Sequence, residues 1–295
     1  MSETAKAKSP LLAWPNEWGK PRPPAWMFFG VFFFGLAALI MIPYTLDYAS
    51  RGDTLQVFYG IVGGLVGVSF CAILVPNLRV RRKELPRGIT AGYDTGDGPG
   101  LRIVFALTRK LIVILWLVVG VAFLVLRGLL FATHLSKTDD SGRSAINVGG
   151  LIIVICALAL AVVMISYLAL GKNRRGSVIM TPGGITLALG SAVRTIAWDE
   201  IGAVYAVLIS NSRAVRINPA PDSRIRVKIG RNLIDYLQRG YYEQNMDLHA
   251  GVLGIDPALL LYLVRFYRQH PDARQELATK AVVNRMRSGE LLVER

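Results

Sequence analysis

The sequence predicts an α-helical membrane protein with four transmembrane helices, followed by a soluble α+β domain. Two features of the sequence indicate this division, and the chain changes from one to the other at Lys172. Before that residue, four long apolar runs recur with almost no charge inside them. After it, the chain consists of short stretches of alternating polarity and one late amphipathic helix. The hydrophobic content of 53% is higher than a soluble globular protein needs, and the excess lies in the first part.

Four segments have the roughly 20 mostly apolar residues that a membrane-crossing helix requires. They are residues 26–44, 55–75, 111–131 and 148–170, within a predicted transmembrane domain of residues 26–171. Each is too evenly apolar to be a soluble amphipathic helix, which would show a polar face. No Asp, Glu, Lys or His lies in the middle of a span, and this disfavours an ion-coupled transporter.

The distribution of basic residues predicts how the spans are oriented. The N-terminal tail, residues 1–25, and the loop between the second and third spans, residues 78–110, together hold 12 Lys and Arg. The other two connections hold three. We therefore expect a multi-pass protein of the plasma membrane with both termini in the cytoplasm. The loop carries a juxtamembrane basic cluster, which consists of Arg79, Arg81, Arg82 and Lys83.

Within that loop, residues 93–100 are rich in glycine and aspartate and predict a flexible turn. Their spacing matches neither a dinucleotide-binding nor a nucleoside-triphosphate-binding loop. Residues 101–110 are expected to form a juxtamembrane helix that leads into the third span.

Small residues give the second span a face on which another helix can approach closely. Gly60, Gly64 and Gly67 lie on this face, at the spacing that favours close helix packing. Two interpretations are open: packing inside the four-helix bundle, or homo-oligomerisation through residues 55–75.

The charge of the chain, +14, is spread over both parts and does not form one basic tail. Residues 1–170 hold 16 basic and 9 acidic side chains, and residues 171–295 hold 18 and 11. We expect membrane lipids as partners and no nucleic acid. Attraction to anionic lipid headgroups is the simpler explanation for basic residues beside membrane spans. The only cysteines, Cys71 and Cys156, lie inside apolar runs, so no disulfide framework or redox motif is predicted.

Short strands are predicted after Lys172 from alternation and turn signals. They cover residues 177–181, 185–189, 194–198, 201–209, 213–217 and 224–229. The first two flank a Pro-Gly-Gly hairpin signal, and the last two flank a turn rich in proline and aspartate. Trp198 is expected to be a core anchor, and the carboxylates that follow it to form a turn or salt bridges.

One amphipathic helix follows the strands and is expected to cover a sheet. Asp256 is its predicted N-cap, Pro257 suits the first helical position, and the pair His270-Pro271 ends it. A more polar helix over residues 272–287 is expected outside the core. Residues 231–253 are expected to be helix and loop.

Several segments carry a resemblance to a known group of domains. They read Ile196-Ala-Trp198-Asp199-Glu200-Ile201, Gly254-Ile-Asp256-Pro257 and Tyr267-Arg-Gln-His270-Pro271. With the order of strands and final helix, residues 177–278 resemble the bacterial PH-like domains of uncharacterised actinobacterial four-span membrane proteins. The resemblance implies a PH-like β-barrel capped by a C-terminal helix over residues 172–278. It implies no catalytic residues. Residues 279–295 are expected to be a polar C-terminal helix or tail.

The best candidate binding residues lie on the last predicted strands. Strict alternation places the cations of residues 224–228 on one face, and a paired strand would add two more. The candidate basic face consists of Arg213, Arg216, Arg224, Arg226 and Lys228. Such a face would dock on anionic headgroups or on an acidic partner, and the alternative is a solvated face. The three histidines are scattered, so no metal site, cofactor or catalytic group is predicted.

These features favour a non-enzymatic integral membrane protein, a scaffold or adaptor whose PH-like domain binds a protein partner or an anionic lipid surface. A small channel or transporter subunit is the first alternative, and a membrane enzyme with an unrecognised site is the second.

Overall fold

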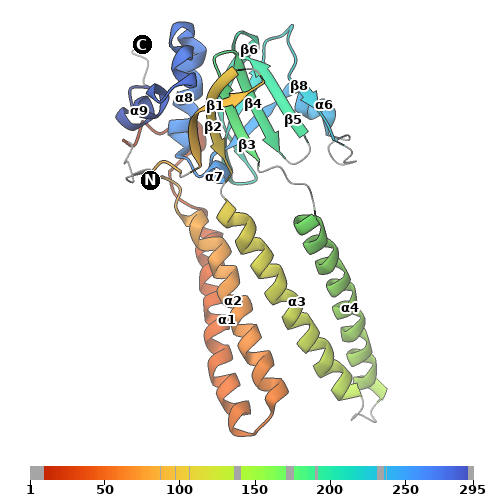
Figure 1. Ribbon diagram of the computed structural model, residues 1–295. Helices are drawn as coiled ribbons and strands as arrows, with labels where there is room; N and C mark the ends of the chain where they lie inside the picture. Colours follow the sequence, from red (N-terminus) through yellow and green to blue (C-terminus); the bar gives the residue numbers. More distant parts are fainter. Residues whose placement is uncertain are drawn as a thin grey trace. The chain divides into compact units, whose positions relative to one another are not determined.

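The computed structural model contains a helical unit and a sheet unit (Figure 1). It describes residues 10–86, 88–96, 98–105, 107–135, 141–170, 176–189, 192–230, 236 and 238–291. The helical unit consists of Pro23–Leu78 and Thr108–Gly171. The sheet unit consists of Met1–Arg22, Arg79–Leu107 and Lys172–Arg295, so three separate stretches of chain build it.

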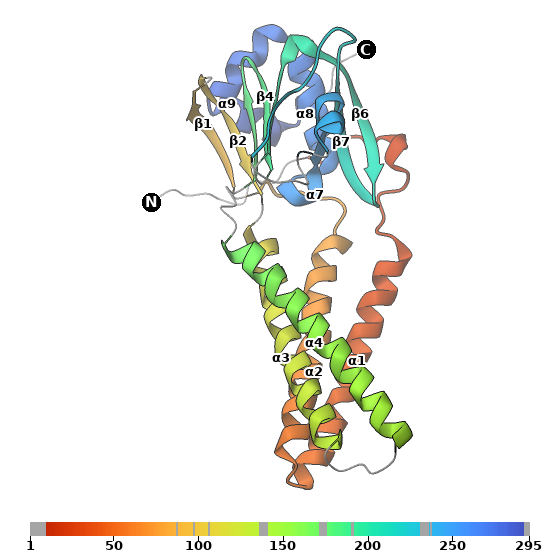
Figure 2. The ribbon, with the colours of Figure 1, turned by 90° about the vertical axis from the view of Figure 1, so that its right-hand side faces the viewer.

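The helical unit confirms the four predicted apolar helices. They are α1 (Ala25–Ser50), α2 (Thr54–Leu78), α3 (Leu107–Leu135) and α4 (Ser141–Leu170) (Figures 1 and 2). Each contains a stretch long and apolar enough to cross a membrane. The helices extend beyond the predicted spans because polar flanking residues continue the helical backbone, as at the end of α1.

Helix α1 covers the glycine face of α2. A Cβ atom added at Gly67 would lie 2.7 Å from the carbonyl oxygen of Phe34 and 2.9 Å from the Cβ atom of Ala38. Gly60 and Gly64 face the same helix. The helix-packing face predicted from the sequence thus lies against α1 of the same chain, and a second copy would have to displace α1 to use it.

Replacing Gly67 by isoleucine is expected to push α1 and α2 apart. Overpacking of this kind costs about 1–3 kcal/mol, because backbone and side chains must shift to make room. The thermal unfolding of the detergent-solubilised protein would show a lower midpoint than that of the unaltered chain. Gly120→Ile in α3 is the matched control, since nothing lies within 4 Å of a Cβ atom at that position. Equal midpoints for both variants would contradict the close approach of α1.

The sheet unit contains two antiparallel sheets. The six-stranded sheet has the order β1-β2-β3-β4-β5-β8 and the three-stranded sheet the order β6-β7-β9. The first consists of β1 (Ile89–Thr95), β2 (Gly98–Val104), β3 (Ser177–Thr181), β4 (Gly184–Leu189), β5 (Ala192–Ala197) and β8 (Arg226–Lys228). The second consists of β6 (Ile201–Ile209), β7 (Ser212–Pro219) and β9 (Met246–His249). The two sheets are not closed into a barrel in the described part of the chain.

The loop between α2 and α3 supplies the hairpin β1–β2, and here the sequence-based prediction is wrong. Residues 93–100 were expected to be a flexible turn and residues 101–110 a helix, yet β2 runs to Val104 and pairs with β3. Leu101 lies opposite Met180 and Ile103 opposite Val178, and all four side chains are fully buried. The core of the sheet unit therefore depends on a segment that precedes it by two membrane helices.

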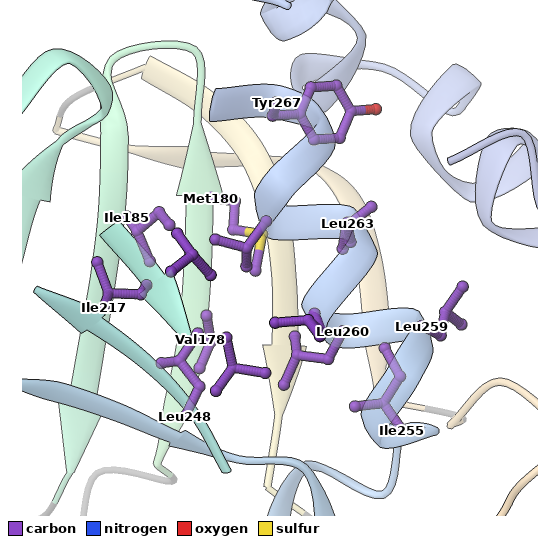
Figure 3. Packing of buried hydrophobic residues seen from close by; sticks show 14 of the residues in the cluster. Val178, Met180, Ile185, Ile217, Leu248, Ile255, Leu259, Leu260, Leu263 and Tyr267 are labelled. Carbon is purple, nitrogen blue, oxygen red and sulfur yellow. The ribbon is translucent and has the colours of Figure 1, made fainter. Parts of the chain in front are cut away.

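The predicted amphipathic helix is confirmed as α8 (Pro257–Gln269), which packs on the inner faces of the strands (Figure 3). The carboxylate of Asp256 caps it by accepting hydrogen bonds from the backbone N–H groups of Ala258 and Leu259, at 3.1 and 3.3 Å. Its apolar stripe contacts residues of both sheets. The helix ends at His270, as predicted.

Two other expectations for the C-terminal part are corrected. The polar helix expected outside the core is a 3-10 helix, η3 (Pro271–Ala278), followed by α9 (Ala281–Ser288). Leu277, Val282 and Met286 of these helices are fully buried, because one side of each turn is apolar even though the segments are polar on average. The stretch expected to be helix and loop contains α6 (Arg239–Gln244), strand β9 and α7 (Ala250–Leu253).

The N-terminal segment belongs to the sheet unit. Leu12 and Trp18 are buried in its core, and the short 3-10 helix η1 (Asn16–Trp18) lies against β6. The Trp18 indole N–H donates a hydrogen bond to the carbonyl of Val207 on β6, at 2.9 Å. Residues 10–22 of the predicted N-terminal tail therefore pack on this unit, because the apolar side chains of Leu12 and Trp18 enter its core.

Candidate functional site

Three exposed cations mark the outer edge of the six-stranded sheet. Arg224, Arg226 and Lys228 are exposed, while Ile225 between the first two is 2% exposed. The alternation predicted for this stretch is therefore observed. Strand β8 is held at this edge by pairing with β5 and by the Ile225 N–H, which donates to the carbonyl of Glu243 at 3.1 Å. We call Arg224, Arg226 and Lys228 the basic edge.

Among the described residues, an acidic side chain contacts the basic edge only at its middle residue. The Arg226 guanidinium lies 3.0 Å from the carboxylate of Glu200, which also accepts a hydrogen bond from the Ala197 N–H at 3.1 Å. The backbone hydrogen bond and Arg226 lower the pKa of the Glu200 carboxyl. Because the Arg226 side chain is 66% exposed, solvent weakens this ion pair. Among the described residues, Arg224 and Lys228 contact no carboxylate.

The other two residues of the predicted basic face lie in the second sheet. Strand β7 pairs with β6 and β9 rather than with β8, so the expected extension of the face by a paired strand is wrong. Arg216 donates two hydrogen bonds to the buried carboxylate of Asp247, at 2.7 and 3.1 Å. Arg213 donates to the carbonyl of Arg22, at 2.7 Å. Both guanidinium groups are thus engaged inside the protein.

The physical environments of these two arginines differ. The hydrogen bonds that Arg216 donates to Asp247 raise the pKa of Arg216 above its ordinary value, whereas burial lowers the pKa of Arg213. Arg216 therefore belongs to a compensated ion pair. Neither side chain is available to a ligand without breaking internal contacts.

The juxtamembrane basic cluster also contains both a side chain that is bonded inside the protein and side chains that are exposed. The Arg81 guanidinium lies 2.9 Å from the carboxylate of Asp256 and donates to the carbonyl of Leu12, also at 2.9 Å. The backbone N–H of Arg82 donates to the same carboxylate, at 3.1 Å. Arg81 thus joins the N-terminal segment, the α2–β1 connection and the start of α8. The side chains of Arg79 and Lys83 are exposed.

A polar cluster that the sequence did not indicate lies beside α6. The Asp247 carboxylate accepts hydrogen bonds from Arg216 and from the Tyr241 hydroxyl. The guanidinium of buried Arg194 lies 3.9 Å from the centre of the Tyr242 ring. Burial lowers the pKa of the neighbouring His249. The cluster was missed because strand β9 was not predicted, and only that strand brings Asp247 to Arg216.

The chemistry of this cluster favours a structural role. It ties α6 to β7 and β9 through charge-assisted hydrogen bonds. No group of three or more His, Cys, Asp or Glu side chains that could hold a metal is found among the described residues. His270 stacks on Phe266 with ring centres 4.4 Å apart, and the side chain of His134 lies outside the described residues.

No protein-family model matches the chain, and no curated protein or solved structure shows a significant match. In the described residues, strands β3 to β9 precede α8, but the two sheets are not closed into a barrel, so the predicted PH-like barrel is not confirmed. Trp198 lies in the core as expected, and its indole N–H donates to the carbonyl of Thr181 at 2.8 Å.

Proposed function

We propose that the protein is a non-enzymatic integral membrane protein whose sheet unit binds an anionic surface through the basic edge. The basic edge carries this proposal because two of its three exposed cations contact no carboxylate among the described residues. Anionic lipid headgroups are the first candidate ligand, and an acidic protein surface is the second. Bound there, the unit would act as a scaffold or adaptor. Its PH-like identity and actinobacterial origin belong to the same proposal.

In this proposal the sheet unit lies in the cytoplasm, at the inner face of the plasma membrane. Residues from all three of its stretches share one core, so all three must lie on the same side of the membrane. These stretches include the two most basic connections of the chain, which the positive-inside tendency holds in the cytoplasm. Since each stretch continues directly into a helix of the helical unit, lipid headgroups are present at high effective concentration.

Reversing the charge of Arg224 and Lys228 to glutamate is expected to weaken binding to anionic vesicles. The protein for this test is the sheet unit with flexible linkers in place of α1–α2 and α3–α4. Each Lys or Arg near an anionic surface contributes about 1 kcal/mol, so the loss of both cations lowers affinity by roughly 30-fold or more. Cosedimentation with vesicles of phosphatidylcholine, with and without phosphatidylglycerol, measures this loss.

The matched control is Lys280→Glu with Arg287→Glu, which changes the net charge equally on exposed residues away from the basic edge. The control variant should retain most of the binding. If both double variants lose binding equally, the whole charge of the unit acts and the basic edge has no special role. If the parent unit binds neither vesicle but captures an acidic protein, the protein-partner version holds.

A further inference from the structure

Arg127 is the only charged residue in the apolar stretch Leu111–Thr133 of α3. At a rise of 1.5 Å per residue it lies roughly 24 Å along this stretch. The hydrocarbon core of a bilayer is about 30 Å thick. Arg127 is therefore placed near the membrane interface opposite the one at which α3 begins, at a depth where a charged group needs a partner.

Aromatic rings of α2 and α3 contact this cation. The Arg127 Cζ atom lies 4.4 Å from the centre of the Phe131 ring and 5.8 Å from that of Tyr59 on α2. Tyr59 packs in turn against Phe123, with ring centres 5.1 Å apart, and lies 6.1 Å from Tyr44 of α1. Rings at this depth form the aromatic belt of a membrane protein, and their faces attract a guanidinium group.

No carboxylate neutralises Arg127 among the described residues. Asp47, in the last turn of α1, is held by Arg51 at 2.7 Å. Asp53 accepts a hydrogen bond from the backbone N–H of Gln56, at 3.2 Å. Within the described part of the chain, the Arg127 guanidinium contacts these two aromatic rings and no acceptor group. Its N–H donors are therefore available to an anion from outside the described chain.

We propose that Arg127, held between Tyr59 and Phe131, binds the phosphate group of a membrane phospholipid. The planar guanidinium can donate two parallel hydrogen bonds to a phosphate, and phospholipid phosphate is the anion present along the whole of this interface. The site is independent of the basic edge, since it lies in the helical unit and at the other end of α3 from the sheet unit's chain connection.

Native mass spectrometry of the full-length protein in a mild detergent tests the site, with phosphatidylglycerol and phosphatidylcholine added as probes. Both lipids carry the phosphodiester group, and an arm with inorganic phosphate tests the free anion. The parent protein is expected to retain one phospholipid more than Arg127→Gln, with about tenfold or greater loss of affinity in the variant. Arg127→Lys keeps the charge but lacks the planar fork, so intermediate binding is expected.

Arg51→Gln is the control, because it removes a cation that Asp47 already holds at the same end of the helices. It should bind phospholipid as the parent does. Equal phospholipid binding by the parent and Arg127→Gln would overturn the proposal, as would full displacement of the lipid by inorganic phosphate. Loss of the added lipid in Arg51→Gln and Arg127→Gln alike would also overturn it, since binding would then follow the total positive charge of this end and not Arg127. Thermal unfolding of the detergent-solubilised variants shows that each remains folded.

Discussion

A fragment of residues 172–295 expressed alone is expected to remain unfolded or aggregated. It contains seven strands and the capping helix, but it lacks β2, whose Leu101 and Ile103 side chains are fully buried against β3. It also lacks Leu12 and Trp18 of the N-terminal segment. Burying one such side chain stabilises a fold by about 1.5–3 kcal/mol. The loss of four is comparable to the whole stability of a domain, about 5–15 kcal/mol.

The matched comparison is a single chain in which flexible linkers join residues 10–22, 79–105 and 176–291. This linked sheet unit restores the missing side chains and is expected to unfold cooperatively on heating. Circular dichroism follows both proteins, and dispersed amide signals in a proton–nitrogen NMR spectrum report a packed core. Cooperative unfolding of the fragment with the same midpoint would show that β1–β2 and the N-terminal segment are accessory.

Replacing Arg81 by alanine is expected to destabilise the sheet unit by about 3–5 kcal/mol, the cost of breaking a buried ion pair from one side. The carboxylate of Asp256 is 3% exposed and would keep its cap of α8, but its charge would lose the guanidinium at 2.9 Å. The carbonyl of Leu12 would also lose its donor. Chemical denaturation of the linked sheet unit, followed by tryptophan fluorescence, measures the change.

Two further variants separate charge burial from loss of packing. Asp256→Ser keeps a capping oxygen without the charge, so Arg81→Ala should cost less in that background than alone. Arg226→Ala removes a surface ion pair and should change stability by no more than about 1 kcal/mol. A cost for Arg81→Ala as small as that for Arg226→Ala would mean that water solvates Asp256 in the folded protein.

Local signals were sufficient for much of the fold. The four apolar helices follow from length and composition, and α8 follows from its stripe, its capping Asp256 and the stop at His270. Strands β3 to β7 were predicted with small errors at their ends, because alternation and turn residues agree there. For the basic edge, the alternation of residues 224–228 correctly indicated which side chains are exposed.

Nonlocal partners account for what the sequence did not indicate. The apolar residues of β2 number only a few, lie beside glycines and pair with a strand that follows two membrane helices later. Arg81 resembles its basic neighbours in sequence, and only the position of Asp256 separates an internal cation from a surface one. Arg216 was placed in the candidate basic face for the same reason, since only strand β9 brings its partner Asp247 to it.

The division of the sheet unit into three stretches has a consequence for biosynthesis. Strand β2 leaves the ribosome well before β3, which follows only after α3 and α4 have been made. At about 5–20 residues per second, the hairpin β1–β2 waits several seconds for its partner. The N-terminal segment waits longer still for β6, the strand that its Trp18 contacts. The sheet unit therefore completes its core only after all four membrane helices have been synthesised. A folded sheet unit thus indicates that the four helices of that chain are already complete.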